Sequence, residues 1–162
     1  ISDLENLQHA IDLQSEIIEN RESEIASRAD LDRLNTLIEL YDREMGASLA
    51  EQSRALEQAA KAQFEQNSPN AIDKLSQAIA LQEEINRQYA RSPERNSYRL
   101  QKLKALQLEW TTRPLYEEIE ELRKQAARAS EKGDFAMTTA LIERALLKQR
   151  RLNQEYRGSP FA

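Results

Sequence analysis

Few residues of this chain have the type and spacing that catalysis or metal binding needs. His9 is the only histidine and the chain has no cysteine, so neither a paired histidine motif nor a thiolate metal site can be assembled. The acidic run Glu117-Glu118-Ile119-Glu120-Glu121 could bind a hard cation loosely through its carboxylate oxygens. It is better explained as the solvated start of a helix after Pro114, where acidic residues favour the helix dipole. We therefore expect no catalytic residue, no cofactor and no metal site.

Three glutamines recur at the same place in an apolar stripe of helical spacing: Gln14, Gln82 and Gln149. An alanine stands four residues before each of them, and these alanines are Ala10, Ala78 and Ala145. A buried amide costs free energy unless it is hydrogen-bonded, and in coiled coils such a residue can fix the register. We expect each glutamine either to bond the facing helix and set the alignment, or to lie half-exposed at the edge of the stripe.

A second group of residues has the chemistry of partner contact. Arg150 and Arg151 lie close to Tyr156 in a basic stretch near the end of the chain. Such a cluster could contact an acidic partner, although a plain charged helix face has the same pattern. Trp110 is the only tryptophan, and it either packs beside neighbouring leucines or is exposed as an anchor for a partner. These four residues are the candidates for partner contact.

The glutamine stripes belong to segments that repeat along the chain. Copies begin at Leu7, Leu75 and Ile142, and the last two align without a gap at an offset of 67 residues. A second element, Gln-Ala-Ala-Lys/Arg-Ala, occurs at residues 58–62 and again at 125–129 with the same offset. A repeated unit usually cannot bury its apolar face alone and has to stack on its neighbours. The repetition therefore predicts the duplication of one helical hairpin.

The elements that position these residues are predicted to be helices. Apolar residues recur at steps of three and four, valine is absent, and three glycines and four prolines are few interruptions for such a chain. Short connections require consecutive helices to turn back antiparallel. They fall near residues 28–30, 67–69, 92–93 and 132–134. Gly133 can end a helix in the left-handed conformation.

These signals together predict an all-α, elongated antiparallel array of about five long helices. Two helices are expected to be kinked, near Gly46 and near Pro114, because both residues weaken a helix interior. The whole chain is expected to form a single helical repeat domain. Its expected parts are repeat 1, about residues 1–67, repeat 2, about 68–133, and a terminal helix, about 134–157.

Charge and hydropathy limit the classes of partner. The net charge of −5 gives no overall attraction to nucleic acid. Residues 1–60 hold 14 acidic and 5 basic residues, and residues 61–162 hold 14 acidic and 18 basic ones, which favours neutralisation between neighbouring helices. No segment reaches the ~20 apolar residues of a membrane span, so we expect no membrane insertion. Because the chain begins at Ile1 without methionine, we expect a soluble segment of a larger protein, with the ectodomain of an anchored or exported protein as one alternative.

One segment near the end of the chain carries a resemblance to a known family. GDFAMTTALIERALLK, residues 133–148, has a glycine-acid-aromatic turn followed by a helix with Ala145 at a small packing position. NSPNAIDKLSQAIAL has Ala71 and Ala78 at both small positions, whereas Thr138 replaces the first alanine in the last copy. These segments resemble the turn and second helix of a tetratricopeptide repeat, without the Trp and Gly signatures of the first helix. The resemblance implies a stack of α-hairpins that binds other proteins.

The sequence thus predicts a non-enzymatic protein–protein interaction or scaffolding module with a protein partner. A homodimer is among the expected states, because terminal repeats without a polar cap invite self-association. A structural, coiled-coil-like spacer of a membrane-anchored or cell-envelope protein is the first alternative. The second is a metal-dependent helical-bundle enzyme, which needs a carboxylate cluster that faces inward.

Overall fold

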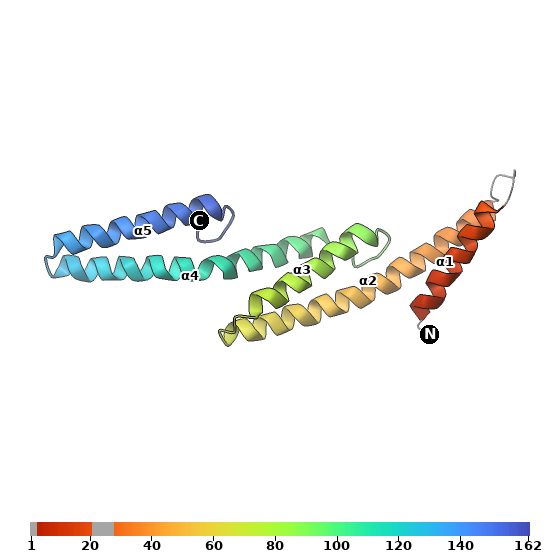
Figure 1. Ribbon diagram of the computed structural model, residues 1–162, viewed down its shortest axis with the longest axis horizontal. Coiled ribbons are helices and arrows are strands. Elements are labelled where there is room, and N and C mark those ends of the chain that lie inside the picture. The colour runs from red at the N-terminus through yellow and green to blue at the C-terminus, as the bar shows by residue number, and fades with distance from the viewer. Residues whose placement is uncertain (1–2, 21–27) are drawn as a thin grey trace. The chain divides into compact units, whose positions relative to one another are not determined.

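The computed structural model describes residues 3–20 and 28–162, which form five α-helices (Figure 1). The helices are α1 (Asp3–Glu19), α2 (Arg28–Glu65), α3 (Ala71–Gln88), α4 (Ser97–Glu131) and α5 (Phe135–Glu155). Helix accounts for 84% of the described residues, and none of them lies in a strand. The prediction of an all-α chain with five helices is therefore confirmed.

Local sequence explains the turns that connect α2 to α3 and α4 to α5. Gly133 has a φ of +73°, a left-handed conformation that glycine adopts without strain, and it ends α4 as predicted. Asp134 then caps α5, because its side chain accepts a hydrogen bond from Met137 N at 3.0 Å. Asn67, with a φ of +55°, takes the left-handed conformation in the turn after α2. Asparagine is among the few other residues that tolerate this region.

The chain divides into two compact units, residues 1–100 and residues 101–162. The first unit holds α1, α2, α3 and the first turn of α4, and the second holds the rest of α4 and α5. The residues near 67 and 133, at which repeat boundaries were expected, lie in the turns of two helical hairpins, α2–α3 and α4–α5.

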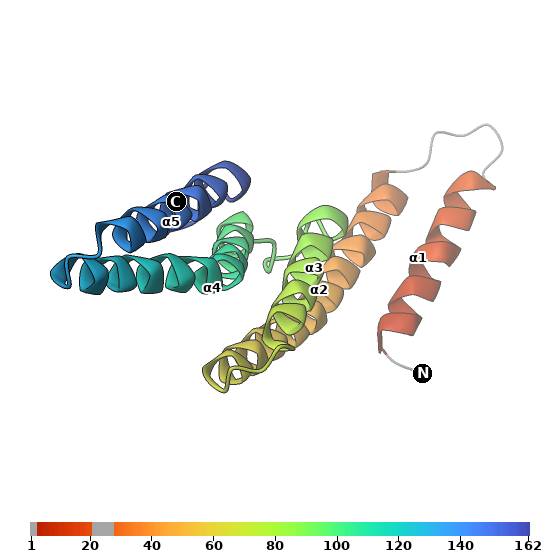
Figure 2. The ribbon, with the colours of Figure 1, turned by 60° about the vertical axis from the view of Figure 1, so that its left-hand side comes forward.

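In the first unit, α2 packs against both α1 and α3. Figures 1 and 2 show α2 and α3 side by side along most of the length of α3. The α2 side of this seam is built from small residues and the α3 side from both small and larger apolar ones, which lets the two helices approach closely. Buried apolar residues of the seam are Ala50 and Ala60 on α2 and Leu75, Ala78 and Ile85 on α3.

The loop after α3, residues 89–96, closes on α2 at Gly46. A Cβ atom placed on Gly46 would lie 1.9 Å from Ser92 Oγ and 2.6 Å from Ser92 Cβ. These distances are far shorter than any van der Waals contact, so a residue without a side chain is required here. The helix α2 is assigned without interruption on both sides of Gly46. Gly46 is a poor helix former, but it permits this close contact between the loop and α2.

In the second unit, α4 and α5 lie side by side and antiparallel (Figures 1 and 2). Their shared core consists of Ile119, Leu122 and Ala126 on α4 and Leu141, Ala145 and Leu152 on α5. The segment after α5 folds back onto this core, where the Phe161 ring stacks on Tyr116 with centroids 4.5 Å apart. Helix α4 is assigned through Pro114, a residue that has no N–H group for the helix ladder.

Candidate functional site

A cluster of polar side chains inside the first unit joins α2, α3 and the start of α4. Arg99, in the first turn of α4, donates from Nη1 to Glu57 Oε2 at 2.5 Å and from Nη2 to Ser53 Oγ at 3.1 Å. Its Nε donates to Gln82 Oε1 at 3.1 Å. Ser53 is fully buried, and its hydroxyl donates to Ala78 O at 2.8 Å. All three donor nitrogens of one arginine are therefore bonded to side chains from two other helices, which is an arrangement for positioning helices.

Gln82 connects this cluster to the loop after α3. Its side chain is buried, and Nε2 donates to Asn86 Oδ1 and to Glu94 O, both at 3.1 Å. Asn86 Oδ1 also accepts from Asn96 N at 2.8 Å. Asn96 Oδ1 in turn accepts from Arg99 N at 2.8 Å, which caps the start of α4. One buried amide thus orders both the loop and the helix that follows it.

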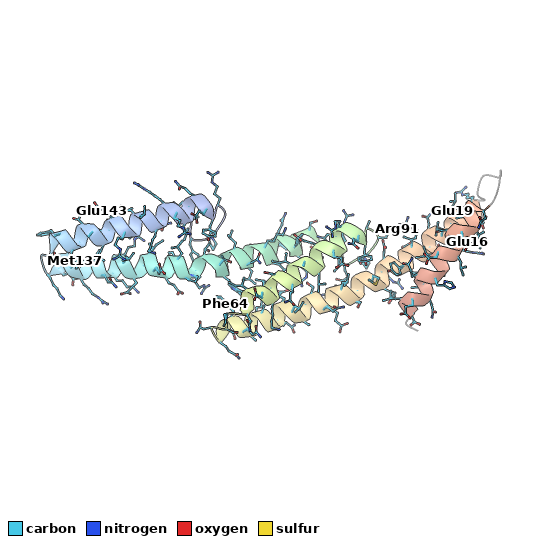
Figure 3. All side chains as sticks on the ribbon, in the orientation of Figure 1. Glu16, Glu19, Phe64, Arg91, Met137 and Glu143 are labelled. Carbon is cyan, nitrogen blue, oxygen red and sulfur yellow. The ribbon has the colours of Figure 1, made fainter. Side chains whose placement is uncertain are left out.

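A second anchor holds the beginning of the same loop to α2. Asp42 is buried, and its Oδ2 accepts from Arg91 N at 3.0 Å. The guanidinium group of Arg91, which is labelled in Figure 3, donates to Asn35 O at 2.8 Å and to Asn35 Oδ1 at 2.9 Å. A hydrogen bond to a buried carboxylate is stronger than one between neutral groups. The loop is therefore fixed to α2 at one end and to α3 at the other.

We call Arg99 and the three side chains that it bonds, Ser53, Glu57 and Gln82, the Arg99 cluster. Glu57 supplies its negative charge. Burial raises the pKa of Glu57, but the hydrogen bonds and charges of Lys61 and Arg99 outweigh burial and bring the pKa below its usual value of 4.5. Lys61 Nζ lies 2.6 Å from Glu57 Oε1, whereas Arg99 bonds the other carboxylate oxygen. A carboxyl group whose pKa is lowered by folding stabilises the fold above its unfolded pKa, and this contribution is lost as the pH falls through the folded pKa.

Glu57→Gln is expected to lower the free energy of unfolding at neutral pH and to have a smaller effect in acid. The reason is that the wild-type carboxyl group becomes neutral below its folded pKa, after which the two side chains differ little in charge. Urea unfolding of both proteins between pH 7 and about pH 3 measures the difference. A difference that stays constant over this range would contradict the role assigned to the Glu57 charge.

In the second unit, Gln149 makes hydrogen bonds of the same kinds as Gln82. Its Nε2 donates to Asn153 Oδ1 at 2.8 Å and to Phe161 O at 3.1 Å. These partners lie four and twelve residues along the chain, as the corresponding partners of Gln82 do. The Oε1 atom differs: in Gln82 it accepts from Arg99, whereas no donor among the described residues reaches it in Gln149.

Ser159 ties the segment after α5 to α4. Its Oγ lies 2.9 Å from Thr112 Oγ1 and accepts from Phe161 N at 3.2 Å. Both Thr112 and Ser159 are buried, so the two hydroxyl groups satisfy each other away from water. Ser92, which stands 67 residues before Ser159, is the residue that faces Gly46 on α2.

Thr112→Val is expected to lower the free energy of unfolding by about 1 kcal/mol, because it keeps the side-chain shape and leaves the Ser159 hydroxyl without its buried partner. Thr111→Val is the matched control. Thr111 is exposed, and its hydroxyl donates to Gln107 O within the same helix, so we expect a change within ~0.5 kcal/mol. Chemical denaturation measures both variants. Equal losses would show that the contact with Ser159 contributes nothing.

Beside Gln149, one face of the α4–α5 hairpin is hollowed. We call this the α4–α5 hollow; its volume is about 170 Å³, and it is lined by Ile119, Arg123, Ile142, Ala145, Leu146 and Gln149. Exposed apolar side chains continue along the same stripe of α5, with Phe135 73%, Ile142 46% and Leu146 51% exposed. Arg123 at the rim forms an exposed pair with Glu120 at 2.9 Å. The hollow thus combines apolar walls, a guanidinium group and an open amide oxygen.

The sequence predicted that each recurring glutamine either bonds the facing helix or lies half-exposed, and Gln149 is half-buried. Gln82 and Gln149 bond the segment that follows their own helix, and Gln82 also accepts from α4, so the facing helix of the hairpin is not the partner of either. Gln14 is buried on α1. Of the accompanying alanines, Ala78 and Ala145 are buried and Ala10 is half-buried.

The four candidates for partner contact differ in their exposure to solvent. Trp110 is 5% exposed, so its ring is buried and does not stand free as an anchor. Arg150 and Arg151 are exposed on α5, where Arg151 Nε pairs with Glu155 Oε2 at 2.9 Å. Tyr156 is half-buried and forms the C-cap of α5. Only the two arginines are therefore presented to solvent.

The acidic run after Pro114 forms mainly an exposed helix face. Glu118 accepts from Lys148 Nζ at 2.6 Å, and this hydrogen bond lowers the pKa of Glu118 below its usual value. Throughout residues 3–20 and 28–162, no three His, Cys, Asp or Glu side chains gather in the way a metal ion requires. His9 is exposed on α1.

Several residues of the Arg99 cluster escape sequence analysis. Ser53 and Glu57 lie on α2 and Arg99 lies on α4, so the two contacts that link these helices join residues 46 and 42 positions apart. One signal was available for Asn86, because Asn86 and Asn153 each stand four residues after a recurring glutamine. A Gln–Asn pair at this spacing in both copies indicates a shared hydrogen bond on one helix face.

Comparisons of this chain with models of protein families, with curated proteins and with solved structures gave no match. Among the described helices, none combines the length and the apolar character that a membrane crossing needs, in agreement with the expectation of no membrane insertion within this segment. The functional interpretation therefore rests on the residues of the chain itself.

Proposed function

We propose that this chain is a non-enzymatic helical repeat module that binds another protein. In this proposal the α2–α3 and α4–α5 hairpins are copies of one unit. The observation that carries it is the shared bonding of Gln82 and Gln149. Each amide donates to an asparagine four residues on and to a carbonyl oxygen twelve residues on, so each holds the segment that leaves its hairpin.

Burial and backbone conformation support the same pairing of positions. At an offset of 67 residues, Ala78 and Ala145 are both buried. In the preceding helix the residue types of 58–62 and 125–129 recur at an offset of 67, but buried positions match at 66, since buried Ala60 then corresponds to buried Ala126. The left-handed turn residues Asn67 and Gly133 differ by 66 as well. We assign the one-residue difference to the turn inside the hairpin.

The finer features of the predicted fold belong to this proposal. In this proposal α2 bends near Gly46, a weak helix former, and α4 bends near Pro114, which lacks an amide hydrogen. The resemblance to a tetratricopeptide repeat falls on the turn and the first part of α5, where Asp134 caps the helix. The expected kinks and the tetratricopeptide-like turn both fit a helical hairpin that stacks on a neighbouring hairpin.

Unpartnered apolar side chains support binding of another protein. Phe135, Leu146 and Leu147 on α5 are more than half exposed. Exposed apolar residues that gather on one element, flanked by charged ones, are typical of interaction surfaces. The exposed arginines of α5, Arg150 and Arg151, supply such charges.

Selection of peptides from a library of helical sequences, with the full chain as the immobilised target, tests the proposal. We expect enriched peptides that bind saturably and raise the midpoint of thermal unfolding, because a ligand that binds only the folded state stabilises it. The matched experiment is a thermal-shift screen with Mg²⁺, Ca²⁺, Mn²⁺ and Zn²⁺, for which we expect no change. A large shift with one cation and no enriched peptide would favour the helical-bundle enzyme. Absence of both would favour the spacer.

A further inference from the structure

One face of α5, opposite the buried residues of that helix, is basic. A shallow hollow of about 470 Å³ lies along this face. We call it the α5 outer face; its main residues are Arg144, Leu147, Lys148 and Arg151. Leu147 is 69% exposed, and Arg144 forms no ion pair with any of the described residues. The α5 outer face therefore presents positive charge beside an open apolar side chain.

The exposure of this face does not depend on a missing neighbour. At an offset of 67 residues, its counterpart lies on α3, a helix that α4 follows directly. The corresponding residues of α3 are all exposed or half-buried, and they are Gln77, Ala80, Leu81 and Glu84. Hairpins of a repeat stack through other faces, so this face stays open to solvent in both copies.

The same face of α1, a further 68 residues back along the sequence, is acidic. We call it the α1 outer face; its main residues are Asp12, Leu13, Glu16 and Glu19. All four are exposed, and Glu16 and Glu19 are labelled in Figure 3. Helix α1 as a whole carries five acidic residues and no lysine or arginine. The two outer faces thus have opposite charges.

The charges of the two faces also have the same spacing. On each helix three charged residues are separated by four and then by three positions. The acidic residues are Asp12, Glu16 and Glu19, and the basic ones are Arg144, Lys148 and Arg151. This spacing keeps three side chains on one face over two turns, or ~10.5 Å. Two such helices side by side in parallel orientation therefore bring three pairs of opposite charges together.

Two of the basic residues have partners within their own hairpin. Lys148 Nζ lies 2.6 Å from Glu118 Oε2, and Arg151 Nε lies 2.9 Å from Glu155 Oε2. Both pairs are largely exposed, and such pairs contribute little to stability. They do not prevent a further carboxylate from approaching, and Arg144 has no such partner among the described residues.

We propose that the α5 outer face of one molecule binds the α1 outer face of a second copy of this chain. The contact also covers the exposed side chains of Leu13 and Leu147. Because the two faces differ, the contact is heterologous, and each added copy again offers one face of each kind. Assembly therefore continues head to tail or closes into a ring. This inference goes beyond the proposed function: it uses the pairing of repeat positions but not the binding of a different protein.

Sedimentation of the full chain tests the contact. Exposed charge pairs are weak, so we expect the average mass to rise with protein concentration with a dissociation constant on the order of 0.1 mM. Because salt screens these charges, the mass should fall to that of the monomer between about 0.05 M and about 0.5 M salt.

Two charge-reversed variants identify the faces. The α1 variant carries Asp12→Lys and Glu19→Lys, and the α5 variant carries Arg144→Glu and Arg151→Glu; Lys148 stays because it bonds Glu118 on α4. Each variant alone should be monomeric, because its two outer faces then have the same sign. An equimolar mixture should associate, because opposite signs meet again.

The control variant carries Lys124→Glu and Arg128→Glu, an equal change of charge on exposed sites of α4, and should associate as the wild type does. Three outcomes would overturn the inference: a wild type that stays monomeric at every concentration, association that neither reversed variant reduces, or reversed variants that do not associate when mixed. The proposed function is judged separately. Library peptides that bind the wild type and both reversed variants alike would keep the function even if this contact failed.

Discussion

Gly46→Ala is expected to lower the free energy of unfolding by about 3 kcal/mol. The added methyl group would lie 2.6 Å from Ser92 Cβ, an atom that no rotation of the serine side chain can move. The loop after α3 therefore has to shift away from α2, which also weakens the hydrogen bond from Arg91 N to Asp42. Urea unfolding measures the loss. An alanine favours an isolated helix by about 1 kcal/mol over glycine, so the expected sign is opposite to that of helix propensity alone.

The double variant Gly46→Ala with Ser92→Gly is the control for this prediction. Removing the Ser92 side chain removes both atoms that clash, so we expect most of the lost stability to return. Ser92→Gly alone should cost less than Gly46→Ala, since it loses the hydrogen bond that Ser92 Oγ accepts from Glu94 N at 3.2 Å. A Gly46→Ala variant as stable as the wild type would refute the close contact between the loop and α2.

Gln82→Leu is expected to lower the free energy of unfolding by about 2–3 kcal/mol. Leucine has a similar size but leaves Glu94 O and the Nε of Arg99 without the bonds that Gln82 supplies. Arg99 also bonds Glu57, and its backbone N–H donates to the capping residue Asn96, so we expect the loss of the Gln82 bond to disturb the whole loop. Chemical denaturation gives the magnitude, and hydrogen exchange of the loop amides shows whether the loop opens.

Gln149→Leu is the matched control for the glutamine. Gln149 has the same two donor bonds but is half-buried and lacks the arginine, so we expect a loss of about 1 kcal/mol. A loss for Gln82→Leu no larger than that for Gln149→Leu would show that the bond with Arg99 contributes nothing. Unchanged stability of the Gln82→Leu variant would contradict the role of Gln82 in positioning the loop and α4.

The helices could be predicted from the sequence because their signals are local. The steps of three and four between apolar residues, the absence of valine and the left-handed Gly133 need no knowledge of distant residues. The contact at Gly46 could not be predicted from local signals. The weakness of Gly46 as a helix former was evident, but its contact with Ser92 joins residues 46 positions apart and appears only in the folded chain.

The candidate site could be predicted only in part, for a related reason. Recurrence indicated the glutamines, since the same residue type stands at the same stripe position in each copy. Their partners could not be named, because a carbonyl oxygen of the following loop leaves no mark in the residue types. The pairing of positions in α2 and α4 was also shifted by one residue, because residue types recur there at an offset of 67 whereas buried positions match at 66.

The central claim is that the two hairpins hold their outgoing segments by the same amide hydrogen bonds. Nuclear magnetic resonance of the chain labelled with ¹⁵N and ¹³C tests it most directly, through the exchange of the side-chain amide hydrogens of Gln82 and Gln149. Both pairs should exchange more slowly than those of exposed Gln154 and should show couplings to the carbonyl carbons of Glu94 and Phe161. Protection of Gln82 together with free exchange of Gln149 would contradict the shared unit on which the proposed function rests.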